Sequence, residues 1–162
     1  MQLVIADTSP VNYLILTGRI EILPQLFEKT ILPAAVAAEL ASSRAPLPVR
    51  QWISNPPHWL EIRSIPSVEA DAVLANIDSG ERAAIQLACA LNADLVLMDD
   101  RKGVYAAERK GLVVTGTLGV LDIAAERGLI EFTAAVRELE TTTFRRPVEL
   151  LEMLLRKHKR TH

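Results

Sequence analysis

Acidic residues follow two short apolar segments that have the composition of buried strands. Asp7 follows residues 3–6, and the pair Asp99 and Asp100 follows residues 95–98. Because polar groups at the carboxyl ends of parallel strands point into one crevice, these carboxylates are expected at the same edge of a sheet. Each position also has a simpler structural explanation, since Asp7 suits a turn and Asp100 suits the cap of a following helix.

Two glutamates on predicted helices extend this acidic set. Glu81 lies in the first turn of a helix predicted over 81–92 and continues the apolar stripe of that helix. A capping box with Asp78 is the alternative explanation for Glu81. Glu39 lies late in a helix predicted over 33–41, where a negative charge opposes the helix dipole, and a surface position is its alternative.

Convergence of Asp7, Glu39, Glu81 and Asp100 would require a cation. Two unit charges ~6 Å apart at an effective dielectric of ~20 repel each other by roughly 3 kcal/mol, and four carboxylates would accumulate more. Oxygen ligands that leave open positions suit Mg²⁺ or Mn²⁺, which retain waters and bind phosphates. Such an ion could generate hydroxide and neutralise charge on a scissile phosphodiester.

Short strands that alternate with helices are expected to position these acids. Strands are predicted near 3–6, 30–32, 60–63, 94–98 and 112–114, and helices after Pro10 and over 33–41, 67–76, 81–92, 101–110, 117–127, 132–140 and 147–159. The Pro-rich stretch 45–57 could contain a further short helix. Ser9 is expected to cap the first helix, with Pro10 at its first position. This alternation is typical of an α/β fold with a parallel sheet.

The 162 residues are expected to form a single domain, 1–162, that ends in a basic helix at about 147–159. From Arg145 onward the chain contains six Lys or Arg residues and two acids, whereas the preceding part carries 12 basic and 18 acidic residues. An acidic body with a basic tail could bind a polyanion while its carboxylates hold metal. A solvated helix end is the alternative explanation for the tail.

The composition argues against several other classes of protein. Hydrophobic residues make up 49% and charged residues 23%, which is ordinary for a soluble domain, and the uncharged stretches are shorter than the ~18 residues of a membrane span. Asp7 interrupts the apolar segment near the N-terminus, so no signal peptide is expected. The single cysteine, Cys89, is expected in the core of a cytoplasmic protein. The three histidines lack the spacing of a zinc site.

Four motifs, in this order and spacing, resemble the PIN domain. They are Asp7-Thr8-Ser9 after the first strand, Val36-x-x-Glu39, Gly80-Glu81, and Leu97-Met98-Asp99-Asp100. The longer segments 78–88 and 99–103 resemble a bacterial and archaeal PIN-like subgroup that is often considered to consist of VapC-type toxins. The resemblance covers about residues 2–155 and implies a PIN-like α/β/α sandwich with a central, mostly parallel sheet.

The resemblance also implies roles for individual residues. Asp7, Glu39, Glu81 and Asp100 match the catalytic acidic quartet of the family, whose acids bind Mg²⁺ or Mn²⁺. Thr8 or Ser9 matches the small hydroxyl position beside the first acid. Together with Arg101, these two residues are the expected substrate-binding positions.

The last motif departs from the family pattern. Met98 stands where the family usually has threonine, and an additional acid, Asp99, intervenes before Asp100. Either Asp99 or Asp100 could therefore face the metal beside Asp7 and Glu81, and the register of the motif favours Asp100.

The function implied by the resemblance is a metal-dependent endoribonuclease, acting as the toxin of a type II toxin–antitoxin pair. A homodimer is expected, as is an antitoxin protein that places an Arg or Lys in the acidic crevice. A PIN-fold module that binds RNA or protein without cleavage is the alternative. An aspartate-nucleophile phosphatase is disfavoured, because Ser9 occupies the position where that enzyme class has a second acid.

Overall fold

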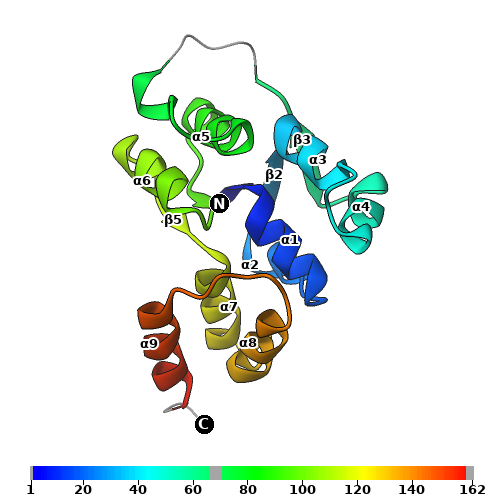
Figure 1. The fold of residues 1–162 in the computed structure, drawn as a ribbon, viewed down its shortest axis with the longest axis vertical. Coiled ribbons are helices and arrows are strands. Elements are labelled where there is room, and N and C mark those ends of the chain that lie inside the picture. Colours follow the sequence, from blue (N-terminus) through cyan, green and yellow to red (C-terminus); the bar gives the residue numbers. More distant parts are fainter. Residues whose placement is uncertain (1, 66–70, 160–162) are drawn as a thin grey trace.

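In the part of the chain that the structure describes, a parallel sheet of five strands forms the centre, in the order β3-β2-β1-β4-β5 (Figure 1). The computed structural model describes residues 2–65 and 71–159. The strands are β1 (Leu3–Ala6), β2 (Lys29–Pro33), β3 (Leu60–Arg63), β4 (Leu95–Leu97) and β5 (Val114–Thr115). All pairings between these strands are parallel, which confirms the predicted α/β class.

Helices cover both faces of this sheet (Figure 1). Within the described residues they are α1 (Thr8–Leu16), α2 (Ile22–Leu26), α3 (Ala34–Ala41), α4 (Leu47–Ser54), α5 (Ser79–Leu91), α6 (Arg101–Arg109), α7 (Thr117–Glu126), α8 (Phe132–Glu140) and α9 (Val148–Lys159). None of these described helices combines the length and the apolar character needed to cross a membrane.

The alternation of side chains along β1 divides the core into two layers. Ile5 packs with buried residues of α5 and α6, whereas Val4 and Ala6 pack with those of α1, α3, α4 and α7 to α9. Successive strand residues point to opposite faces of a sheet, so a strand covered on both sides must be apolar throughout. The arrangement is the α/β/α sandwich that the sequence predicts.

Two prolines that were predicted to begin helices take other positions in the structure. Helix α1 begins at Thr8 with Asp7 at its N-cap position, so the prediction that Ser9 caps this helix is wrong. Pro10 is accommodated in the first turn because the first four N–H groups of a helix need no carbonyl partner within it. Pro33 ends β2 in an extended conformation, and α3 begins one residue later.

Three further features differ from the sequence predictions. Helix α2 was not predicted, although it buries Ile22, Leu23 and Leu26. The helix expected over 67–76 falls partly outside the described residues, and its described part contains only a 3-10 turn at Ala72–Leu74. Cys89 is exposed rather than part of the core, because it lies off the buried stripe of α5.

The C-terminal helix α9 folds back onto α7 and α8 (Figure 1). The His158 ring stacks on Phe132 with centroids 4.5 Å apart, and its Nε2 lies 2.7 Å from Oδ1 of Asp122. Lys157 forms ion pairs with Asp122 and Glu126 of α7. This basic residue of the tail is therefore engaged within the protein.

Candidate active site

Asp7 lies where β1 and β4 end side by side. Ala6 pairs with Leu97, and the Asp7 backbone N–H donates a 2.9 Å hydrogen bond to the Leu97 carbonyl. The Asp7 side chain is only 6% exposed. The adjacent ends of the two strands thus bring Asp7 into the neighbourhood of the Asp99–Asp100 pair, as the topology of a parallel sheet requires.

Glu81 approaches the same edge from the first turn of α5. Asp78 caps this helix, with Oδ1 accepting a 2.8 Å hydrogen bond from the Glu81 backbone N–H. The capping alternative therefore explains how the helix begins. It does not account for the Glu81 carboxylate, which is buried and whose Oε2 has no hydrogen-bond partner within the described residues.

Glycine at position 103 lets α6 pass close to that carboxylate. A Cβ at Gly103 would overlap Oε2 of Glu81 and would also lie 2.6 Å from the sulfur of Met98. Met98, the residue that departs from the family pattern, is buried beneath α6. The backbone of α6 therefore forms one wall of the Glu81 site, and any larger residue at 103 would displace the acid.

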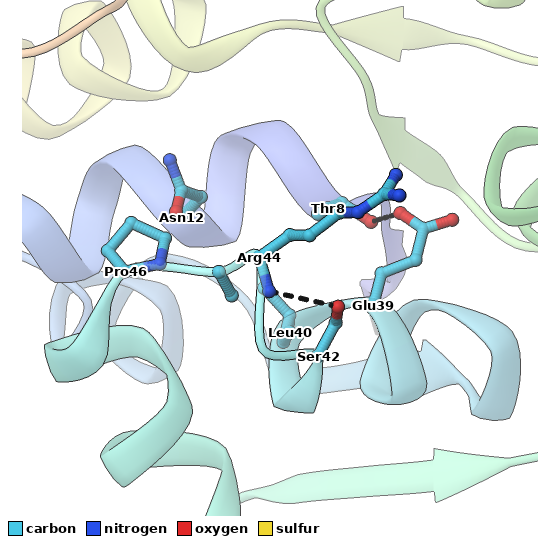
Figure 2. Close-up of a pocket in the computed structure, with 8 residues that line it drawn as sticks. Thr8, Asn12, Glu39, Leu40, Ser42, Arg44 and Pro46 are labelled. Carbon is cyan, nitrogen blue, oxygen red and sulfur yellow. Dashed lines mark hydrogen bonds between the residues drawn. The ribbon is translucent and has the colours of Figure 1, made fainter.

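Glu39 reaches the site from α3 and is held by α1. Its Oε2 accepts a 2.5 Å hydrogen bond from the Thr8 hydroxyl (Figure 2). A Cβ at Gly80, the residue before Glu81, would overlap Oε1 of Glu39. Glu39 is thus half-buried between the first turns of α1 and α5, rather than on an open surface.

Asp99 and Asp100 have different environments, although they are adjacent in sequence. Asp99 accepts hydrogen bonds from the Thr117 backbone N–H (2.7 Å) and from the Thr117 hydroxyl (2.6 Å), at the start of α7. Asp100 is exposed at the N-cap position of α6, and its side chain makes no capping hydrogen bond there. The position of Asp100 agrees with the helix-cap alternative, but the capping bond itself is missing.

The electrostatics of Asp7 reflect burial among other acids. The pKa of Asp7 is raised to about 7, chiefly by burial and also by the charges of Asp78, Glu39 and Asp99, against a backbone hydrogen bond from Thr8 that lowers it. A carboxylate with this environment carries its charge at neutral pH only at a cost.

Glu81 is perturbed more strongly. The pKa of Glu81 is raised to about 9, chiefly by burial, then by a side-chain hydrogen bond with Asp78 and by the charges of Asp78, Asp100 and Asp7. Burial also raises the pKa of Asp99, against the two hydrogen bonds from Thr117. The acids from β1, α5 and the end of β4 therefore influence one another, which requires that they lie near each other.

The donor chemistry of this cluster fits a hard divalent cation. As their side chains lie, the described residues contain no group of three or more His, Cys, Asp or Glu that could hold a metal ion. Mg²⁺ is commonly bound through one or two carboxylates, with waters and substrate phosphates completing its shell. The unpartnered Oε2 of Glu81, the buried Asp7 and the exposed Asp100 supply oxygen donors of that kind.

The expected substrate-binding residues lie at the margins of the acidic cluster. The Thr8 hydroxyl donates a hydrogen bond to Glu39. Ser9 is half-buried in the first turn of α1, and Arg101 is exposed at the start of α6. Sequence reasoning did not assign a site role to Thr117, which holds Asp99. The signal available for it was the segment 116–119, which the sequence favours as a strand-to-helix turn and which belongs to the family resemblance.

One comparison with known proteins, a scan against family models, gives a match. A protein-family model described as PIN domain matches residues 3–160, which is nearly the entire chain. A search of curated proteins found no match.

Proposed function

Because this chain belongs to the PIN-domain family, we propose that it is a Mg²⁺- or Mn²⁺-dependent endoribonuclease. PIN domains are generally nucleases, and they typically use divalent metals. The observation that carries the proposal for this member is the Glu81 carboxylate. It is buried among other acids, and its Oε2 has no hydrogen-bond partner within the described part of the chain.

In this proposal Asp7, Glu81 and Asp100 hold the cation, and its binding draws together side chains that, within the described residues, form no group of three ligands as they lie. A bound ion would lower the pKa of a water and neutralise charge on the scissile phosphate. Glu39 completes the catalytic quartet, and the Thr8 hydroxyl fixes the direction of its carboxylate. The helix backbone approaches the Glu39 carboxylate closely at Gly80 and the Glu81 carboxylate closely at Gly103, which restricts the positions of both side chains.

Two of these ligands must lose a proton before they bind a cation. The pKa of Asp7 is about 7 and that of Glu81 about 9, so Asp7 carries a proton over part of the neutral range and Glu81 over all of it. Metal ligands bind in their deprotonated form, so cation affinity is expected to rise with pH across this range. Binding of the cation in turn removes the repulsion between the carboxylates.

Asp100 is the better candidate for the last metal ligand. Both carboxylate oxygens of Asp99 are engaged by Thr117, so Asp99 fixes the start of α7 against the end of β4. Asp100 has no such bond and contributes to the raised pKa of Glu81. Asp99 remains the alternative ligand if its bonds to Thr117 open.

The test is cleavage of mixed RNA with and without EDTA by the wild-type protein, Asp100→Asn and Asp99→Asn. Removal of a metal ligand is expected to lower the cleavage rate at least ~100-fold in Asp100→Asn. Asp122→Asn is the matched control, since this acid lies away from the sheet edge in an ion pair with Lys157.

Full activity in EDTA would contradict the metal mechanism. Loss in Asp99→Asn alone, with the fold intact by circular dichroism, would assign the ligand to Asp99. RNA binding without cleavage by the wild type under all metal conditions would favour the non-cleaving module instead.

We extend the proposal to the biological role: a toxin of a type II pair, homodimeric, acting on cytoplasmic RNA. The sequence resemblance of segments 78–88 and 99–103 to VapC-type toxins supports it. An antitoxin would insert an Arg or Lys among the acids.

Two experiments test this biological role. Induced expression should arrest bacterial growth for the wild type and not for Asp7→Asn. Light scattering should give about twice 17.8 kDa. Growth without arrest would contradict the toxin role. A monomer at micromolar concentration would contradict the homodimer.

A further inference from the structure

A pocket of about 370 Å³ lies beside the acidic cluster, between α1 and the connection from α3 to α4 (Figure 2). Its volume is within the range of small-molecule sites, roughly 300–1,000 Å³. Its lining consists of Thr8, Asn12, Glu39, Leu40, Ser42, Arg44, Ala45 and Pro46. Most of these residues have no part in the site described above.

Arg44 is the cationic side chain in this lining. It is exposed, and its guanidinium makes no hydrogen bond or ion pair within the described residues. Figure 2 shows the side chain extended along the pocket toward Thr8. The Arg44 backbone N–H donates to Oγ of Ser42 (3.2 Å), so the local turn depends on the main chain and not on the guanidinium.

Arg50, a nearby arginine, has a structural role in the same segment. Arg50 of α4 donates from its Nε to the Ala45 carbonyl at 3.0 Å and thereby fixes the connection to α4. Arg44 does not have a comparable bond in the described part of the chain. Its five donors therefore remain available for a ligand.

Two residues belong to both the pocket and the acidic cluster. Thr8 and Glu39 line the pocket, and the Thr8 hydroxyl is committed to Glu39. A ligand that occupies the acidic cluster can therefore continue directly into the pocket. In the pocket it would meet the guanidinium of Arg44 together with neutral polar groups of Asn12 and Ser42.

We propose that this pocket binds the RNA backbone next to the cleaved bond, with Arg44 pairing with the neighbouring phosphate. The inference rests on the proposed function, because it requires an extended polyanion at the acidic cluster. Arginine presents a planar fork of donors that matches phosphate oxygens. Asn12 and Ser42 supply hydrogen bonds to the same nucleotide. Arg44 is thus a positioning residue for the substrate rather than part of the chemistry.

The test is binding of a labelled single-stranded RNA, measured by fluorescence anisotropy at several salt concentrations with Ca²⁺ in place of Mg²⁺ or Mn²⁺, so that the acidic cluster is neutralised and the RNA is not cleaved. Arg44→Ala is expected to bind about tenfold more weakly than the wild type, as for loss of one arginine contact. The slope of log affinity against log salt should fall by ~0.7, the value for one phosphate contact on a single strand. Arg44→Lys should keep the slope and recover part of the affinity.

Arg137→Ala is the matched control, since Arg137 is an exposed arginine in the last turn of α8. It should leave the affinity and the slope unchanged. In cleavage assays with metal, Arg44→Ala should raise KM about tenfold and leave kcat within about twofold, which a change in folding or chemistry would not do.

Equal binding by Arg44→Ala and the wild type would overturn the inference and leave the nuclease proposal intact. An equal loss in Arg137→Ala would overturn it too, because general charge would then explain the effect. A wild-type protein that neither binds nor cleaves RNA would reject the proposed function itself. An effect of Arg44→Ala on binding of an acidic peptide but not of RNA would assign the pocket to a protein partner.

Discussion

Two groups of acids in this protein have opposite electrostatic environments. On α7, Asp122 and Glu126 face Lys157, and Asp122 also contacts His158. At the carboxyl edge of the sheet, Asp7 and Glu81 face other carboxyl groups, and burial raises the pKa of both. Within the described residues, the acids on α7 thus form ion pairs with a lysine, whereas the charges that shift the pKa values of Asp7 and Glu81 are those of other acids.

The difference separates structural acids from candidate functional ones. The pairs on α7 attach α9 to the rest of the domain, and their charges are balanced within the fold. At the sheet edge, ionisation of Asp7 or Glu81 destabilises the metal-free fold, because burial and the neighbouring carboxyl groups disfavour the charged form. Such an arrangement is useful when an external cation supplies the missing charge.

The largest expected difference between the two regions is in their response to metal. Linkage gives about 2.7 kcal/mol of stabilisation at a hundred times the dissociation constant, and each kcal/mol moves the melting midpoint by roughly 2–4 °C. The wild type should therefore melt about 5–10 °C higher in saturating Mn²⁺ than in EDTA. Asp7→Asn should show almost no increase, and Asp122→Asn should respond like the wild type. Scanning calorimetry measures all three.

Identical responses of the wild type and Asp7→Asn would contradict a shared metal site at Asp7. A lost response in Asp122→Asn would instead place the metal at α7, which would reverse the comparison.

A smaller difference is expected in the dependence of stability on pH without metal. The folded-state pKa of Asp7, about 7, lies above its ordinary value of 3.8, so its contribution is fully present below pH 3.8 and is lost as pH rises through about 7. From pH 6 to pH 7 this group alone should remove about 1 kcal/mol. Urea unfolding in EDTA should show a steeper decline over this range for the wild type than for Asp7→Asn. Parallel declines would mean that Asp7 titrates as an ordinary surface acid.

The fold could be predicted well because its signals are local. Continuous apolar segments such as 3–6 and 95–97 indicate strands buried on both faces, and the helices between them require parallel connections. Helix α2 was missed because it is only five residues long, too short for a periodic signal. The exposure of Cys89 was missed because one helical position separates it from the buried stripe of α5.

The site could be predicted only as a set of residues. Strand ends indicate that Asp7 and Asp99–Asp100 share an edge of the sheet. The hydrogen-bond partner of Asp99, however, is Thr117, which lies 18 residues away at the start of α7. The requirement for glycine at position 103 likewise arises from how closely α6 approaches Glu81. Such contacts depend on tertiary packing, which residue types and spacing do not encode locally.

The smallest expected effect concerns the balanced acids on α7. Lys157→Ala removes ion pairs to Asp122 and Glu126, but the Lys157 side chain is 42% exposed, and exposed pairs contribute about 0.2–1 kcal/mol. Asp122 keeps its contact with His158 in this variant.

The melting midpoint of Lys157→Ala should therefore fall by less than about 4 °C, and the decrease should shrink at high salt because surface pairs are screened. The ion pairs raise the pKa of Lys157 above 10.5, so their contribution is fully present below that pH and is lost only as pH rises through the folded value. The loss in Lys157→Ala should consequently be constant from pH 6 to pH 8, in the range where Asp7 titrates. A loss that varies with pH across this range would show that the acids of α7 are as perturbed as those at the sheet edge, and the contrast between the two regions would then fail.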